Sequence, residues 1–410
     1  MARVLVAMSG GVDSAVAAAL LVEQGHEVTG VHLRLADLPL EEQVPGHGCC
    51  TLDDAQDARR SAQVLGIPFY VWDLSEAFER EVQTPFAAAY AAGRTPNPCV
   101  TCNERVKYAA LLDRAVALGF DALATGHHAR LRRAGRPVTE PGPGVALHRA
   151  ADRSKDQSYV LYVATPAQLA RTLLPVGERS KQDIRSLAGE LGLRVASKPD
   201  SYDVCFIPDG DTAGYLGERL PSAPGPIVDA DGSVLGTHDG VWRFTVGQRR
   251  GLGLDHHERR FVTDVDAERR TVRVGPREEL ACRWAEVDVP TWTLGAVPEG
   301  PVRVQIRAHG GSVPGRVVPV GDDAGGRRAV APATGDAAAA GVAAPTPTRT
   351  DDHRVGAARV RLELEEPVFG LALGQAAVVY DATNEICLGG GRVVAAERPA
   401  GLPLATGTGS

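Results

Sequence analysis

Short apolar runs alternate with longer amphipathic stretches over the first 205 residues. The runs have the length of buried strands and the longer stretches have helical spacing. The pattern predicts strands at 4–8, 28–33, 68–72 and 122–125, and helices at 15–24, 52–65 and 103–118. Such alternation is typical of an α/β fold, in which helices cover both faces of a parallel sheet. Ligands of these folds bind at the carboxyl ends of the strands.

Helical spacing becomes rare after residue 206, where glycine, proline and short β-like runs are more frequent. The runs predict a small central domain at 206–280 and a β-barrel domain at 281–410; they lie at 227–228, 261–263, 271–274, 302–306 and 377–380. Residues 321–353 are mostly small or polar and have no periodicity. We therefore expect a disordered loop there, inserted in the barrel.

The turn after the first predicted strand is the first candidate site. Its sequence is Ser9-Gly10-Gly11-Val12-Asp13-Ser14, and a helical pattern follows. Paired glycines allow a sharp turn that brings backbone N–H groups close to a ligand. The N-terminus of the next helix adds to such an anion site, and the two serines offer hydroxyl donors. The Gly-Lys-Ser/Thr ending of a Walker A loop is missing, so we predict a different kind of phosphate-binding loop.

Composition is that of an ordinary globular protein and gives weak guidance on partners. Of 410 residues, 44% are hydrophobic and 23% are charged. We find no leader peptide and no apolar run long enough for a membrane span, and therefore expect a cytoplasmic protein. The net charge of −7 argues weakly against nucleic acid, but arginines cluster at 130–136 and 243–270. Seven cysteines without an export signal predict free, catalytic or metal-bound thiols.

The cysteines of the segment 95–103 are the second candidate site. We expect Cys102 at or just before a helix N-terminus, where the helix dipole and free N–H groups favour a thiolate nucleophile. Cys99 and Cys102 form a C-x-x-C pair, which leaves open half of a zinc site, redox thiols, or ligands of an iron–sulfur cluster completed by Cys205. Zinc is the weakest alternative because no second ligand pair exists. The other cysteines are expected to be an accessory or idle pair (Cys49 and Cys50) and packed residues (Cys282 and Cys387).

Taken together, these segments resemble the tRNA-specific 2-thiouridylase family of PP-loop ATP pyrophosphatases. The turn from Ser9 to Ser14 is similar to the PP-loop, and Cys102 and Cys205 lie in contexts similar to the family's cysteine motifs. The similarity spans nearly the whole chain except 321–353, with further matching segments at 125–130, 155–159, 244–253, 374–375 and 388–391. The resemblance implies a PP-loop ATP-binding domain at 1–205, a tRNA-contacting central domain and a C-terminal β-barrel.

The family converts the wobble uridine of certain tRNAs to 2-thiouridine. The resemblance implies that ATP adenylates the uracil 2-oxygen, that the PP-loop holds pyrophosphate, and that Mg²⁺ neutralises the phosphates. Cys205 would accept sulfur as a persulfide from a cysteine desulfurase or sulfur relay protein, and Cys102 would then close a disulfide with it. The implied ATP contacts are Ala7, Met8, Ser9, Gly10, Gly11, Val12, Asp13, Ser14, Leu33 and Gly126. The implied target-base contacts are Asn97, Pro98 and Cys99, and the implied tRNA contacts are His127, Lys155, Asp156, Gln157, Arg307, Ala308 and Gln375.

Two departures from the family pattern concern the chemistry. Some relatives carry Asp in place of Cys99, so the extra thiol makes a 4Fe–4S cluster on Cys99, Cys102 and Cys205 an alternative to the persulfide. The segment 307–309 lacks the aromatic residue that often follows the arginine. Two other function classes remain open from the residues: a PP-loop ligase that needs no cysteine, such as a tRNA lysidine synthase, and a non-catalytic iron–sulfur RNA-binding protein.

Overall fold

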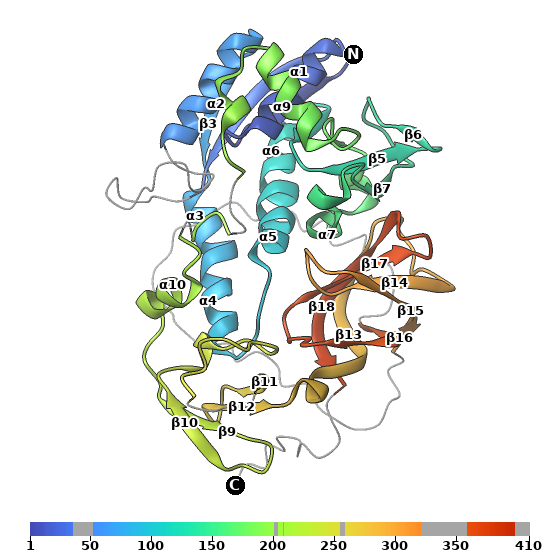
Figure 1. The fold of residues 1–410 in the computed structure, drawn as a ribbon. Coiled ribbons are helices and arrows are strands. Elements are labelled where there is room, and N and C mark those ends of the chain that lie inside the picture. Colours follow the sequence, from blue (N-terminus) through green and yellow to red (C-terminus); the bar gives the residue numbers. More distant parts are fainter. Residues whose placement is uncertain (36–51, 201–203, 208, 255–258, 321–358, 398–410) are drawn as a thin grey trace, which may run out of the picture.

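The computed structural model describes residues 1–35, 52–200, 204–207, 209–254, 259–320 and 359–397 (Figure 1). The insertion predicted at 321–353 and the pair Cys49 and Cys50 lie outside these residues. Of the helices described, none combines the length and apolar character needed to cross a membrane.

A five-stranded parallel sheet forms the N-terminal domain, with strand order β3-β2-β1-β4-β8. Its strands are β1 (Arg3–Ala7), β2 (Glu27–Arg34), β3 (Phe69–Asp73), β4 (Ala122–Thr125) and β8 (Thr172–Leu173). The α-helices around it are α1 (Val12–Glu23), α2 (Leu52–Leu65), α3 (Ser75–Phe78), α4 (Thr84–Ala91), α5 (Pro98–Thr101), α6 (Leu112–Ala117), α7 (Ser158–Leu161), α8 (Pro166–Leu169) and α9 (Lys181–Glu190). The π-helical segments are η2 (Glu79–Gln83) and η3 (Cys102–Leu111), and the 3₁₀ helices are η4 (Arg153–Lys155) and η5 (Arg194–Ser197).

The central strand β1 is apolar on both faces because helices pack on both sides of the sheet. Successive side chains of a strand point to opposite faces. Val4 and Val6 pack in one cluster with α1 and α2 residues, whereas Leu5 packs in another cluster with residues of η3 and α6. This two-sided burial is what an almost continuous apolar strand predicts.

The helix predicted to start at residue 103 begins earlier. Asn97 is the N-cap of α5, and its side chain accepts hydrogen bonds from the N–H groups of Cys99 and Val100. The helix then continues through η3, whose backbone is π-helical, into α6. The expectation that Cys102 lies at the helix N-terminus is therefore wrong by about one turn. The reason is that Pro98 fits the first helical position and Asn97 caps it.

The central domain contains α10 (Thr212–Arg219), η6 (Val241–Arg243) and a four-stranded sheet in the order β10-β9-β12-β11. The strands are β9 (Gly225–Val228), β10 (Val234–His238), β11 (Phe261–Asp266) and β12 (Thr271–Gly275). Its apolar residues, among them Ile227, Val262 and Val272, form a core cluster of their own.

The C-terminal domain is a closed barrel in which strand β13 pairs with both β16 and β18. It follows helix η7 (Arg277–Leu280), and its strands are β13 (Ala281–Trp292), β14 (Pro301–Gln305), β15 (Ser312–Pro319), β16 (Arg359–Phe369), β17 (Ala376–Asp381) and β18 (Ile386–Ala396). The predicted architecture, a parallel α/β domain followed by a small central domain and a C-terminal β-barrel, is confirmed.

One part of the first 205 residues belongs to the barrel sheet. Strands β5 (Ala129–Arg133), β6 (Arg136–Pro137) and β7 (Ala146–Arg149) extend it through antiparallel pairing of β7 with β18. In Figure 1 these strands lie between the parallel sheet and the barrel. The N-terminal and C-terminal domains therefore share a sheet.

Candidate nucleotide and thiol site

The PP-loop follows strand β1 and leads directly into α1. Gly10 has a φ of +80°, and a Cβ there would lie 2.3 Å from the carbonyl oxygen of Asp54 in α2. Glycine is therefore required both by the backbone conformation and by the close approach of α2. Gly126, after β4, is as tightly placed, since its Cβ would lie 2.6 Å from the backbone N of Ser14. The two glycines bring three segments together at the carboxyl end of the sheet.

The serines of the PP-loop hold the loop's own shape. The Ser14 hydroxyl donates to the Gly11 carbonyl at 3.0 Å and accepts from the Ser9 N–H at 3.1 Å. The Ser9 hydroxyl accepts from the Gly11 N–H at 3.4 Å. Ser14 is only 4% exposed, so its hydroxyl preorganises the loop in this structure rather than pointing to a ligand as the sequence suggested.

Asp13 lies in the first turn of α1, and its charge is compensated. The Lys181 ammonium donates to both carboxylate oxygens at 2.7 and 2.8 Å, and His128 Nε2 donates to Oδ1 at 3.0 Å. Burial alone would raise the pKa of Asp13, but the hydrogen bonds from His128 and Lys181 outweigh it and lower that pKa. A carboxylate beside an anion site would repel phosphate, and this pairing removes most of the repulsion.

His127 connects the helix that carries Cys102 to the nucleotide loop. Lys107 of η3 donates to His127 Nε2 at 3.2 Å, so the imidazole proton is on Nδ1, which donates to Thr125 Oγ1 at 2.7 Å. Burial lowers the pKa of His127 well below its usual range, and the nearby Lys107 charge acts in the same direction. His127 is therefore neutral, and through Gly126 it adjoins the PP-loop.

The segments that carry the two candidate cysteines pack against the same helical layer. Cys102 is 8% exposed and belongs to the largest apolar cluster, on which Cys205 also packs. The neighbour of Cys205, Phe206, makes ring contacts with Phe78 of α3 and Phe86 of α4 at centroid distances of 5.6 and 5.5 Å. Helix η3, which begins at Cys102, packs against α3 and η2. The structure thus places both cysteine-bearing segments on the α3–α4 helical layer.

The loop before Asn97 is where all three domains meet. Thr95 N–H donates to the Leu373 carbonyl at 2.8 Å in the barrel domain, and Thr95 Oγ1 donates to Thr245 Oγ1 at 3.3 Å in the central domain. A Cβ on Gly374 would lie 3.2 Å from Arg94 Cβ. The predicted contact Gln375 follows Gly374 directly, so it adjoins the loop at Arg94 and Thr95 that leads to Asn97 and Pro98.

Arg307 extends this convergence toward the central domain. Its guanidinium donates to the carbonyls of Phe369 and Gly370 at 3.2 and 3.1 Å, and it lies beside Gly247 of the segment 244–253. Arg307 therefore contacts the same two segments of the barrel and central domains, around 370 and 247, whose neighbours Leu373 and Thr245 bond to Thr95.

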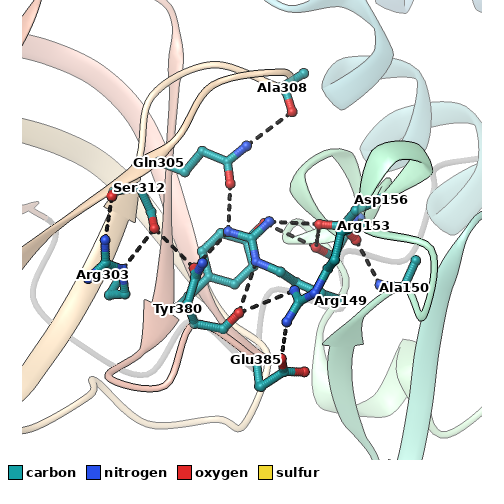
Figure 2. Close-up of polar contacts among 12 residues, drawn as sticks. Arg149, Ala150, Arg153, Asp156, Arg303, Gln305, Ala308, Ser312, Tyr380 and Glu385 are labelled. Atoms are coloured by element: carbon teal, nitrogen blue, oxygen red, sulfur yellow. Dashed lines mark hydrogen bonds and ion pairs between the residues drawn. The ribbon is translucent and has the colours of Figure 1, made fainter.

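A buried arginine fixes the loop that carries Arg307 and Ala308 (Figure 2). Arg149 of β7 donates to Asp156 at 2.7 Å, to Gln305 of β14 at 2.7 Å and to Asn384 at 2.8 Å. Its guanidinium also lies 3.6 Å from the Tyr380 ring centroid. Gln305 in turn donates to the carbonyls of Arg307 and Ala308. We call Arg149, Asp156, Gln305, Tyr380 and Asn384 the Arg149 junction.

The segment with Lys155, Asp156 and Gln157 has its side chains directed to three partners. Lys155 pairs with Asp200, Asp156 with Arg149, and the Gln157 side chain accepts from the His128 N–H at 2.9 Å. Asp156 is 7% exposed in its side chain. Asp156 is thus linked through Arg149 and Gln305 to the loop that carries Arg307 and Ala308. Gln157 is linked through His128 to Asp13 of the PP-loop.

Comparison with known proteins identifies the family. Family models match residues 2–209 (tRNA methyl transferase HUP domain), 213–276 (tRNA methyl transferase PRC-barrel domain) and 350–393 (aminomethyltransferase beta-barrel domain). A tRNA-specific 2-thiouridylase of Salinispora tropica is 50% identical over 96% of this chain and 99% of its own length. One of Beutenbergia cavernae is 48% identical over 100% and 99%. The chain belongs to the tRNA-specific 2-thiouridylase family. The predicted family and enzyme class, a tRNA sulfurtransferase, are thereby confirmed.

Solved structures overlap much less with this 2-thiouridylase-family chain. A 4-thiouridine synthetase–RNA complex with bound ATP aligns over 53% of this chain and 50% of its own, with a TM-score of 0.32 and 18% identity. That similarity is too low for a comparison of sites.

The resemblance implies two bound groups at this site, ATP and, as an alternative, a 4Fe–4S cluster. Gly10 and Gly126 let α2 and the turn after β4 pack directly on the loop, and the loop leads into the N-terminus of α1, where backbone N–H groups fit a nucleotide phosphate. A 4Fe–4S cluster does not fit, because across the described part of the chain no three His, Cys, Asp or Glu residues are placed to hold a metal ion. The structure therefore does not support the alternative with Cys99, Cys102 and Cys205 as cluster ligands.

Sequence reasoning missed three lysines of this site. Lys107, Lys181 and Lys198 reach His127, Asp13 and the Gly10 carbonyl, respectively. Lys181 and Lys198 are remote in sequence from the PP-loop, and no local pattern marks them. Lys107 lies five residues after Cys102 in η3, but the π-helical backbone that sets its direction is visible only in the structure.

Proposed function

We propose that this chain converts the wobble uridine of tRNA to 2-thiouridine in an ATP-dependent reaction. One observation carries the proposal. Helix η3, which starts at Cys102, contacts His127 through Lys107. Gly126, the residue before His127, packs directly on the backbone of Ser14 in the PP-loop. A thiol-bearing helix and a pyrophosphate loop are thus neighbours at the carboxyl end of one sheet, where ligands of α/β folds bind.

The first step is adenylation of the uracil. The uracil 2-oxygen attacks the α-phosphorus of ATP, and pyrophosphate leaves while it is bound by the PP-loop amides and the N-terminus of α1. Mg²⁺ would supply charge neutralisation and is held mainly by substrate phosphates in such sites. The Asp13 carboxylate accepts hydrogen bonds from Lys181 and His128. Asp13 would therefore bind Mg²⁺ only after the Lys181 ammonium has moved away.

The second step is sulfur transfer. Cys205 carries a persulfide, donated by a cysteine desulfurase or sulfur relay protein. The Cys102 thiolate attacks Cys205 Sγ, and the Sγ–S bond breaks. The outer sulfur leaves with the electron pair as hydrosulfide and replaces AMP at C2. A Cys102–Cys205 disulfide forms, and a thiol reductant is then needed to restore both cysteines.

The base reaches these thiols by leaving the anticodon stack. The loop 95–99 meets the barrel and the central domain, which gives the extruded nucleotide contacts from three directions. Asn97 Oδ1 is occupied by the helix N-terminus, which leaves its amide N–H₂ to donate to the base. We also propose that the protein acts in the cytoplasm, where its tRNA substrate is charged and used.

Nucleoside mass spectrometry of tRNA tests the function. Purified protein with ATP, tRNA and a persulfide donor should form 2-thiouridine and release AMP and pyrophosphate. Cys102→Ser and Cys205→Ser should each lower thiolation at least about 100-fold, since the nucleophile is lost. Cys282→Ser is the matched control, because Cys282 is buried in the barrel and donates to the Trp284 carbonyl, which serine can also do.

The outcomes separate the alternatives. Unchanged wobble thiolation in a deletion strain would exclude the proposed reaction. ATP-dependent modification of the substrate that survives both Cys102→Ser and Cys205→Ser would indicate a PP-loop ligase instead, because a ligase needs neither cysteine.

A further inference from the structure

The C-x-x-C pair lies on one turn of a helix, a placement that the sequence pattern did not predict. Because α5 begins at Pro98, both Cys99 and Cys102 belong to the helix that continues through η3. The Cys102 N–H donates to the carbonyl of Cys99, three residues back, and also to that of Pro98. Residues three apart in a helix lie on the same face, so the two side chains are neighbours.

Helix geometry brings this pair within the range of a disulfide. With a rise of about 1.5 Å per residue and a Cα radius of about 2.3 Å, Cα atoms three residues apart are separated by about 5 Å. Disulfides usually join Cα atoms about 4.4–6.8 Å apart. A bond between Cys99 and Cys102 therefore needs no unwinding of the helix.

The backbone of Cys99 is held on both sides. Its N–H donates to Asn97 Oδ1 at 3.0 Å, and its carbonyl accepts from Asn103 Nδ2, also at 3.0 Å. Asn103 is 2% exposed, and its Nδ2 donates to the Val160 carbonyl of α7 at 3.2 Å as well. Little backbone freedom is left to lose when Cys99 bonds to Cys102, which favours an intramolecular reaction.

The two cysteines differ in their access to solvent. Cys102 is 8% exposed, whereas Cys99 is half-buried. A reductant in solution therefore reaches Cys99 more readily than Cys102. The course of thiol–disulfide exchange depends on which sulfur is accessible to attack.

We propose that Cys99 is a resolving thiol that releases Cys205 after each sulfur transfer. The inference rests on the proposed function, because that reaction leaves Cys102 and Cys205 joined in a disulfide. Cys99 loses its proton to water, and its thiolate attacks Cys102 Sγ. The Cys102–Cys205 bond breaks, and Cys205 leaves with the electron pair as a thiolate that can take the next persulfide. A Cys99–Cys102 disulfide forms in its place, so the step involves no net oxidation or reduction.

A thiol reductant in solution completes the cycle. Its thiolate attacks the accessible Cys99 Sγ, the Cys99–Cys102 bond breaks, and Cys102 leaves as a thiolate. A second reductant thiol then attacks the mixed disulfide and frees Cys99, and the oxidised reductant departs as a disulfide. The buried nucleophile Cys102 is thus restored without direct contact with the reductant.

Redox titration of Cys205→Ser tests the pair without tRNA, ATP or a sulfur donor. Full-length protein is equilibrated in glutathione buffers, its thiols are blocked with iodoacetamide, and tryptic peptides are analysed by mass spectrometry. Trypsin cleaves after Arg94 and Arg105, so a Cys99–Cys102 disulfide lies within the single peptide 95–105. This disulfide should exceed the glutathione adducts of the same peptide at least about tenfold, because the second thiol reacts intramolecularly.

A single turnover without reductant tests the exchange. Wild-type protein with a persulfide on Cys205 receives ATP and tRNA, and samples are blocked at intervals. The Cys102–Cys205 cross-link should form first and then fall at least about fivefold, while reduced Cys205 and the disulfide within 95–105 increase together. The cross-link should persist in Cys99→Ser and in Cys99→Asp, which both lack the resolving thiol. Cys282→Ser, a substitution in the barrel core, is the matched control and should follow the wild type.

The proposal is overturned if the peptide 95–105 of Cys205→Ser forms no internal disulfide in any of the glutathione buffers. It is equally overturned if the wild-type cross-link persists as it does in Cys99→Ser. A wild-type protein that forms no 2-thiouridine would instead refute the proposed function. The titration would still show in that case whether Cys99 and Cys102 form a redox pair.

Discussion

Replacement of Arg149 by methionine tests whether the Arg149 junction holds the N-terminal domain and the barrel together. The side chains of Arg149 and Asp156 are only 9% and 7% exposed. Methionine would fill much of the space but would leave the Asp156 carboxylate buried without its cation. Gln305 would also lose a charged donor (Figure 2), as would Asn384.

The expected cost follows from this burial. Removal of one partner of a buried ion pair typically costs about 3–5 kcal/mol. Asp156 keeps the N–H groups of Ala150 and Ser158 and the Ser158 hydroxyl, which compensates part of the loss. We therefore expect Arg149→Met to lower the free energy of unfolding by about 3–4 kcal/mol.

Equilibrium unfolding in urea, followed by tryptophan fluorescence, measures this cost. The matched control is Arg132→Met, which removes an arginine–glutamate pair of similar length, 2.9 Å to Glu178, with side chains 27% and 35% exposed. Such a pair contributes about 0–1 kcal/mol. A cost below about 1 kcal/mol for Arg149→Met would refute the reasoning. Because Gln305 holds the carbonyls of Arg307 and Ala308, the variant should also raise the KM for tRNA.

Three further predictions concern the site. Gly126→Ala should lower ATP-dependent AMP formation at least about tenfold, because the new Cβ would lie 2.6 Å from the Ser14 backbone N. Gly189→Ala, whose Cβ would meet no atom within 4 Å, should leave AMP formation unchanged. Equal activity of the two variants would contradict the packing argument. Asn97→Asp should keep the helix cap and lose thiolation, whereas Asn97→Ala should lose both and cost about 1 kcal/mol in urea; a fully active Asn97→Asp would show that the amide does not serve the base. Burial lowers the pKa of His127, so the unfolded chain binds a proton near pH 6.5 that the folded chain does not, and stability is lost as the pH falls below about 6.5. His127→Gln should reduce this loss by up to about 1.4 kcal/mol per pH unit, and an identical pH dependence in wild type and variant would contradict the lowered pKa of His127.

Sequence pattern predicted the parts of the fold that depend on local periodicity. The parallel strands, the PP-loop and the change to β structure all follow from patterns within a few residues. The helix start was missed because a cap at Asn97 and a proline at the first position were not weighed together. Cys102 therefore lies inside the helix, and its nucleophilicity cannot be attributed to free N–H groups at the helix end.

Long-range contacts were beyond such patterns. Strands β5 to β7 lie among the α/β elements in sequence, yet β7 pairs with β18 more than two hundred residues later. The partners of Asp13 are separated from it by 115 residues for His128 and 168 for Lys181. A lysine on a helix start has no local signal that shows which carboxylate it will meet, so these contacts needed the structure.

The most direct test of the account is to trap the cysteines after one turnover. Wild-type protein with a persulfide on Cys205 reacts with ATP and tRNA without reductant, and the peptides are then analysed by mass spectrometry. We expect a Cys102–Cys205 disulfide that forms in step with 2-thiouridine, one for each base modified. Formation of 2-thiouridine with both cysteines still reduced, or with Cys102 replaced by serine, would contradict the account.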